Sequence, residues 1–437
     1  MHEVTVCVGS ASSSPGPHGL GIKQTPTRRR HAEPVKCALS PAKLRRGEKV
    51  PFFEHASGRD DLKRNSPHLC LEHDTERRPT QQGLFPISCQ WMRTLQHERR
   101  AIPTVIAREW RQILAKYREP SQTRSLVELI TTAGAFAASW LLTWVTLDLG
   151  YWLSLFLTVP AAGFLVRLFM IQHDCGHGAF FRRRAVNDWV GRVIGVLTLT
   201  PYDIWRRSHA IHHAGSGNLE RRGIGDINTL TVREYLGLSR WRRLGYRLYR
   251  NPIVMFGFGP AYLFILQHRL PIGAIRGGLQ PWLSTMATNA AIGLTVVGMM
   301  RLVGVAPFLL VHLPVTLLAA SIGVWLFYVQ HQFENTYWAR APLWTVQEAA
   351  LHGSSHYDLP HILRWFTANI GVHHVHHLSS RIPYYRLQCV LRDHPELCAV
   401  GRLTLLKSLA CVRLVLWDER RCRLISFREL RRARPAA

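Results

Sequence analysis

Four long apolar runs constrain the fold of this chain more than any other feature. Each is close to the roughly twenty residues, about 30 Å as a helix, that are needed to cross the hydrocarbon core of a bilayer. Short polar turns join the first run to the second and the third to the fourth. The sequence therefore predicts an all-α integral membrane protein with four transmembrane helices in two hairpins. The runs comprise residues 126–145, 151–171, 283–300 and 306–330.

Two shorter apolar segments are not expected to cross the membrane. Residues 186–200 are interrupted by Asp188 and Arg192. Residues 253–266 are only fourteen positions long and contain Pro260. Segments of this length and composition are typical of helices that lie in the membrane interface or re-enter it from one side. The expected number of spans therefore stays at four.

Histidines cluster in three segments that flank the apolar runs: residues 173–177 (box one), 209–213 (box two) and 373–377 (box three). On a helix, residues three and four positions apart share a face, so each box aims its imidazoles in one direction. Imidazole is the commonest metal ligand in proteins. One tetrahedral ion takes about four ligands, so eight such histidines predict two metal ions. The candidate ligands are His173, His177, His209, His212, His213, His373, His376 and His377.

Membrane topology restricts where a shared metal site can lie. Boxes two and three must face the same side, so an even number of spans has to separate them, and the second hairpin supplies two. Residues 206–250 are rich in arginine, which the positive-inside rule places in the cytoplasm. His331 ends the last apolar run at the depth of box one and is the candidate ninth ligand. We therefore expect a cytoplasmic helical cap that carries a two-metal site.

Other polar residues near the boxes receive structural interpretations. Cys175 within box one is expected to pack as a small apolar residue, because its neighbours supply imidazoles. Arg167 lies near the end of the second run and is expected to extend toward lipid headgroups. Residues 403–416 have apolar positions at helical spacing and predict one amphipathic helix. Three further histidines are expected not to be ligands: His352, His356 and His361.

The formal net charge of +27 comes almost entirely from arginine. Nucleic acid, anionic lipid headgroups and an acidic electron carrier are the partner classes that such a charge allows. The membrane runs and the lack of a recognisable binding module oppose nucleic acid.

Residues 1–91 lack apolar periodicity and predict a disordered basic extension, with the membrane domain at 92–437. The nine cysteines form no CxxC pair, which opposes a thiolate zinc site or a disulfide scaffold.

These motifs resemble those of the membrane-bound fatty acid desaturases, with the greatest similarity to the bacterial acyl-lipid branch. The resemblance spans about residues 108–427. It includes HDCGHGAFF around box one, Pro201-Tyr202 before box two, FYVQHQFE at 327–334, and the segment from Trp365-Phe366 to Pro383 around box three. An extension before residue 92 and histidines at 352 and 356 depart from the family pattern.

The resemblance implies a specific chemistry. The nine histidines would hold two iron ions, and Asp174 and Asn369 would be hydrogen-bond partners of the ligands. With O2 as co-substrate, the centre would introduce a cis double bond into a fatty acyl chain, here that of a membrane lipid. The sequence contains no haem-binding or nucleotide-binding motif, so electrons would come from a separate ferredoxin-like or cytochrome b5-like donor. The implied location is the bacterial inner membrane, with the metal site and both termini cytoplasmic.

Other functions fit parts of the pattern. A fatty acyl or alkyl hydroxylase, epoxygenase or ketolase on the same scaffold would share the first hydrogen abstraction, although the box spacing favours desaturation. A metal transporter would place ionisable ligands midway through the spans. Here every box lies at the end of a span, which opposes a conduction path.

Overall fold

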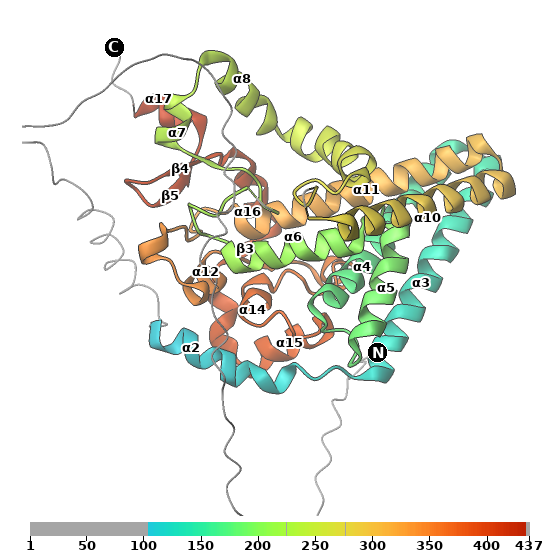
Figure 1. The fold of residues 1–437 in the computed structure, drawn as a ribbon, viewed down its shortest axis with the longest axis horizontal. Coiled ribbons are helices and arrows are strands. Elements are labelled where there is room, and N and C mark those ends of the chain that lie inside the picture. Colours follow the sequence, from blue (N-terminus) through green and yellow to red (C-terminus); the bar gives the residue numbers. More distant parts are fainter. Residues whose placement is uncertain (1–103, 224, 276, 434–437) are drawn as a thin grey trace, which may run out of the picture. The chain divides into compact units, whose positions relative to one another are not determined.

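A computed structural model describes residues 104–223, 225–275 and 277–433. The disorder predicted for 1–91 lies outside the described residues. Four helices in the described part are long and apolar enough to cross a membrane, which confirms the predicted all-α membrane fold with two hairpins (Figure 1). They are α3 (Gln122–Val145, continued by the 3₁₀ turn Thr146–Leu149), α4 (Tyr151–His177), α10 (Leu279–Val303) and α11 (Val305–His331).

The first hairpin is held together by a polar and aromatic face of α3. The buried residues of α3 recur three or four positions apart, so they form one stripe that packs on α4. Helix α4 also packs against α11, and it is the most buried of the four spans. None of the most apolar window of α10 is buried within the described chain. The first hairpin and α11 thus form the packed part of the membrane region.

The prediction for Arg167 is wrong. Its side chain is buried in α4 and donates a hydrogen bond of 2.5 Å to Glu128 of α3. A second hydrogen bond from the guanidinium reaches the carbonyl of Trp365, and the Tyr384 hydroxyl donates to Glu128 at 3.0 Å. The short helix α13 (His361–Phe366) covers this position on α4. Arg167 therefore joins the cap to the membrane hairpin instead of extending to headgroups.

Short helices form the cap on the metal-binding side of the bundle. Boxes two and three lie on α6 and α14, and box one is the last part of α4. Because α4 continues without a break into box one, the first histidines are fixed by a membrane-spanning helix. Besides α13, the cap contains α2 (Thr104–Ile113), α5 (Arg184–Leu197), α6 (Tyr202–Gly215), α7 (Val232–Gly237), α8 (Arg240–Tyr249), α12 (Val346–His352), α14 (His373–Leu378), α15 (Tyr384–Asp393) and α17 (Phe427–Arg432).

Two small sheets close the cap. Strand β1 (Leu230–Thr231) pairs in parallel with β4 (Leu416–Asp418), which pairs antiparallel with β5 (Arg423–Ile425). Strand β2 (His356–Asp358) pairs in parallel with β3 (Arg402–Thr404). The single amphipathic helix predicted for 403–416 is therefore wrong, because strand pairing takes both ends of that segment. Only α16 (Leu405–Ala410) and a 3₁₀ turn at Cys411–Arg413 are helical there.

The segment 253–266 is helical without a break, but it is not one of the four helices that are long and apolar enough to cross a membrane. Two π-helical turns, Val254–Phe258 and Tyr262–Leu266, flank α9 (Gly259–Ala261) and lie against α11. Two spans therefore separate boxes two and three, as the topology argument requires.

Candidate metal centre

The structure gathers all nine candidate histidines into two adjacent groups. Each group offers ligand nitrogens that lie within 4.8 Å of one another. The ring of His213 in one group stacks on that of His377 in the other, with centroids 4.1 Å apart. The five-histidine group contains His173, His177, His209, His213 and His376, and the four-histidine group contains His212, His331, His373 and His377.

Helical spacing sorts the histidines between the groups. Residues four apart are displaced by about 40° around a helix, and residues three apart by about 60° in the opposite sense. Accordingly, each i,i+4 pair stays together: His209 with His213, and His373 with His377. The third histidine of each HxxHH box belongs to the other group. Boxes two and three therefore each contribute to both groups, which makes the two sites parts of one centre.

The Nε2 atoms converge at spacings that suit metal coordination. In the five-histidine group, Nε2 of His209 lies 2.9 Å from that of His173 and 3.1 Å from that of His177. In the four-histidine group, Nε2 of His331 lies 3.1 Å from that of His212 and 3.0 Å from that of His373. Ligands bound to one ion at about 2.1 Å are separated by roughly 3.0–3.4 Å. The observed separations are close to this range.

Hydrogen bonds at Nδ1 fix the tautomer of two histidines in the four-histidine group. Nδ1 of His212 donates to Asp226 at 2.5 Å, and Nδ1 of His331 donates to the carbonyl of Gly353 at 3.2 Å. Both Nε2 atoms are then lone-pair acceptors that face each other. Two acceptors at this distance repel unless a cation lies between them, so the donor set fits a metal ion.

Asp174 and Asn369 have different environments. Asp174 is buried, accepts from Nδ1 of His173 at 3.3 Å and from the backbone N–H of Tyr384 at 2.7 Å. Asn369 donates to the carbonyl of Tyr384 at 3.3 Å. No hydrogen bond joins Asn369 to the nine histidines in the described chain. Asn369 thus contacts the segment that binds Asp174, and not a candidate ligand.

Sequence reasoning missed Asp226. It follows box two by a glycine-containing loop and lies outside any helical pattern, so spacing gave no sign that its carboxylate returns to His212. The only sign in the sequence that Asp226 could be a hydrogen-bond partner of a ligand was its position shortly after box two.

Burial keeps five imidazoles of the second and third boxes in the form that binds metal. Burial, reinforced by neighbouring histidines, holds the pKa of His209, His213 and His376 well below the usual range. The same causes lower the pKa of His373 and His377. A neutral imidazole has a free lone pair, whereas the protonated form has none.

Aromatic side chains enclose both groups. The indole of Trp205 stacks on His209 with centroids 4.8 Å apart. A Cβ at Gly176 would lie 2.9 Å from this indole. This close approach explains why position 176, between Cys175 and His177, is a glycine. Phe327 lies against His212 and His331 of the four-histidine group. Cys175 is buried and belongs to neither group, and the same holds for His352 and His356. His361 is exposed and also belongs to neither group.

Comparison with known proteins identifies the family. The fatty acid desaturase family model matches residues 150–407. A fatty acid desaturase of Bacillus subtilis (strain 168) is 45% identical over 318 residues, which is 73% of this chain and 90% of that relative. The chain belongs to the fatty acid desaturase family.

Two cyanobacterial relatives come from Synechocystis sp. An sn-1 acyl-lipid omega-3 desaturase (ferredoxin) is 29% identical over 317 residues, covering 68% of this chain and 78% of the relative. An sn-1 oleoyl-lipid 12-desaturase is 27% identical over 275 residues, covering 62% and 75%. The desaturase is thus an oxidoreductase, and these relatives agree with the bacterial acyl-lipid branch.

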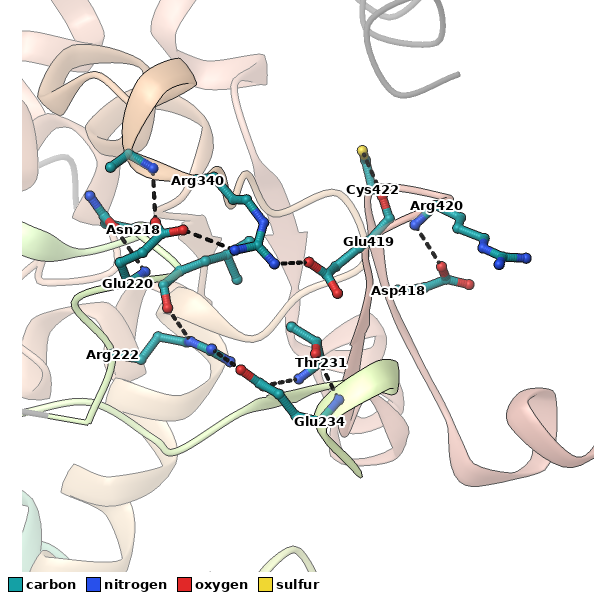
Figure 2. A network of polar contacts seen from close by, with 12 residues as sticks. Asn218, Glu220, Arg222, Thr231, Glu234, Arg340, Asp418, Glu419, Arg420 and Cys422 are labelled. Carbon is teal, nitrogen blue, oxygen red and sulfur yellow. Dashed lines mark hydrogen bonds and ion pairs between the residues drawn. The ribbon is translucent and has the colours of Figure 1, made fainter. Parts of the chain in front are cut away.

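In this desaturase, ion pairs hold the loop that leads to Asp226. Figure 2 shows Arg340 between Glu220 and Glu419, at 3.2 and 2.6 Å. Arg222 pairs with Glu234 at 2.7 Å and also donates to the carbonyls of Leu219 and Thr229. These contacts join the loop after box two to the segment after α11 and to α7. The position of Asp226 therefore depends on contacts between distant parts of the chain.

Proposed function

We propose that this desaturase introduces a cis double bond into a fatty acyl chain of a membrane lipid, using O2 and a di-iron centre held by the nine histidines. The observation that carries the proposal is the convergence of nine imidazoles into two adjacent groups beside two membrane hairpins. The Synechocystis relatives are named as acyl-lipid and oleoyl-lipid desaturases, which supports the substrate class. Residues 92–437 would form the catalytic domain.

Iron suits this donor set. Both groups offer imidazole nitrogen without thiolate, a ligand type that binds iron well. Breaking an unactivated C–H bond is beyond any amino-acid side chain, and iron with dioxygen supplies that chemistry.

The protein's own residues hold the ligand histidines in place and orient their rings. Asp174 and Asp226 each accept a hydrogen bond from a ligand histidine, which fixes the ring and increases its basicity. The indole of Trp205 and the ring of Phe327 cover the imidazoles and exclude water from them. A dry site protects reactive chemistry from side reactions.

Electrons would come from a separate protein. One relative's name specifies ferredoxin, and a ferredoxin-like donor is our first candidate, with a cytochrome b5-like protein as the other. The arginine-rich segment 206–250 would face the cytoplasm of a bacterial inner membrane and attract an acidic donor.

The test is expression of the full chain in a desaturase-lacking host, with total fatty acids analysed by gas chromatography and mass spectrometry. We expect a new unsaturated fatty acid with the wild type and none with His376→Ala, because the four imidazoles left in the five-histidine group would still hold an ion but no longer in the wild-type arrangement. Equal membrane insertion and purified yield of the two proteins is the control. A hydroxy or epoxy product would favour the hydroxylase or epoxygenase, and product from His376→Ala would contradict the metal assignment.

A further inference from the structure

A cavity of about 630 Å³ lies in the cap, and none of the nine candidate histidines lines it. It is formed by β2, β3, α13, α15 and the 3₁₀ turn Pro395–Ala399. Three arginines and one carboxylate contribute to its wall, so the charged side chains there are mainly cationic. The polar residues that matter here are His356, Asp358, Arg364, Gln388, Arg392 and Arg402, and we call this site the arginine pocket.

Two side chains in the pocket retain unused hydrogen-bond donors. Arg364 has no carboxylate partner within the described residues, and its guanidinium donates only to the amide oxygen of Gln388, at 3.5 Å. Nε2 of Gln388 is buried and has no partner in the described chain. The lone carboxylate of the wall, Asp358, is already paired with Arg402 at 2.7 and 3.0 Å. Excess donors around a cationic centre suit a phosphate, which accepts several hydrogen bonds at once.

The helix that carries Arg364 lies against a membrane span. A Cβ at Gly163, midway along α4, would be 2.7 Å from the ring of Phe366 in α13. The same helix exposes Ile362 and Trp365, by 70% and 44%. Large apolar side chains beside a span are expected to contact lipid, because water would penalise them. The arginine pocket therefore lies next to the bilayer surface.

A second helix with exposed apolar side chains follows Arg402 of the pocket. Strand β3, which contains Arg402, leads directly into α16, where Leu406 and Leu409 are exposed by 80% and 57%. The pocket thus combines a cationic wall with two exposed apolar helices. This combination matches the two parts of a phospholipid, a phosphate and its acyl chains.

We propose that the arginine pocket binds the phosphate of an anionic phospholipid whose acyl chains lie on α13 and α16. Arg364 donates to the phosphate oxygens, and the Gln388 amide turns its buried Nε2 toward them on binding, while Arg402 keeps Asp358 neutralised. Free phosphate lacks the apolar contacts, and a zwitterionic lipid adds a cation near the arginines, so both bind more weakly. The proposal concerns lipid binding alone and does not depend on desaturation.

The experiment measures lipid binding to the purified, delipidated full chain by native mass spectrometry during titration with phosphatidylglycerol. We expect Arg364→Gln to weaken binding about tenfold and Gln388→Leu about threefold, as loss of a charged and a neutral hydrogen bond implies. Arg240→Gln, which removes an exposed arginine of α8 outside the pocket, is the matched control and should leave binding unchanged.

Competing ligands distinguish the sources of phosphate. Phosphatidylcholine and inorganic phosphate should each bind at least tenfold more weakly than phosphatidylglycerol. Equal phosphatidylglycerol affinity in Arg364→Gln and Arg240→Gln would overturn the proposal, as would a wild type that binds inorganic phosphate equally well. Should Arg364→Gln fail to fold, unchanged binding by Gln388→Leu would overturn it instead. Because no readout is enzymatic, failure here is distinct from failure of the proposed reaction.

Discussion

The two histidine groups differ in how their hydrogen-bond partners are built. The five-histidine group uses Asp174, which is adjacent to His173 on α4 and 1% exposed. The four-histidine group uses Asp226, whose side chain is 18% exposed and which lies on a loop fourteen residues after His212. One partner is positioned by a continuous membrane helix, and the other by contacts between segments that are distant in sequence.

This difference indicates which group is easier to disrupt. The five-histidine group keeps four imidazoles when one is removed, whereas the four-histidine group keeps three. The loop of Asp226 also depends on partly exposed ion pairs, which contribute little individually. We therefore expect the four-histidine group to lose metal first, and the following changes test that expectation.

The largest effect is expected from removing one ligand of the smaller group. On the proposed di-iron centre, His331→Ala should lower bound iron to about one ion per chain, since three imidazoles fall short of the usual four donors. His177→Ala should retain about two ions, because four donors remain in its group. Iron per chain is measured by elemental analysis of purified protein. Equal loss in both variants would show that the groups do not differ in this way.

The carboxylates provide the next test. Asp226→Ala should lower metal affinity by about 10–100-fold, because His212 loses the partner that orients it. Asp174→Ala should lower both metal affinity and thermal stability, since the buried N–H of Tyr384 also loses its acceptor. Competition with a chelator reports affinity, and unfolding of the metal-free protein reports stability. A stable metal-free Asp174→Ala protein would contradict this division of roles.

Backbone strain in the loop should have a smaller effect. Gly225 has φ of +69°, and a Cβ there would lie 3.0 Å from the carbonyl oxygen of Ser208 in α6. Gly225→Ala should weaken metal binding to the four-histidine group by about tenfold, as a strain of roughly 1–2 kcal/mol displaces Asp226. Gly237→Ala is the matched control, because a Cβ at Gly237 meets no atom within 4 Å. Comparable effects of the two substitutions would rule out a special role for the loop.

The smallest effect is expected from the ion pairs in Figure 2. Arg340 is exposed by 58%, so Arg340→Ala should lower the free energy of unfolding by less than about 1 kcal/mol. The difference from wild type should shrink in high salt, because exposed charges are screened. Denaturation at two salt concentrations measures both quantities. A larger loss that is independent of salt would mean that these pairs hold the loop more strongly than their exposure indicates.

The spans were predictable because length and hydropathy are properties of contiguous residues. The end of α4 was harder to predict from the sequence, because the polar side chains of box one end the apolar run without ending the helix. Spacing predicted that the three histidines of each HxxHH box point in one direction, whereas each box contributes to both groups. That division depends on how α6 and α14 meet, which the spacing within one helix does not specify. The roles of Arg167 and Asp226 depend on partners 39 and 14 positions away, which no local pattern specifies.

The lengths of α4 and α11 determine how far the candidate metal centre lies from the hydrocarbon core. Helices α4 and α11 each have 27 residues and end in candidate ligands. Each is about 40 Å long, roughly 10 Å more than the hydrocarbon core requires. In the proposed reaction, a methylene that reaches the centre would have to rise out of the lipid, at a cost of about 0.8 kcal/mol for each group left in water. Helices α4 and α11 thus hold the candidate metal centre above the hydrocarbon core. The protein would therefore need an apolar channel from the bilayer to that centre.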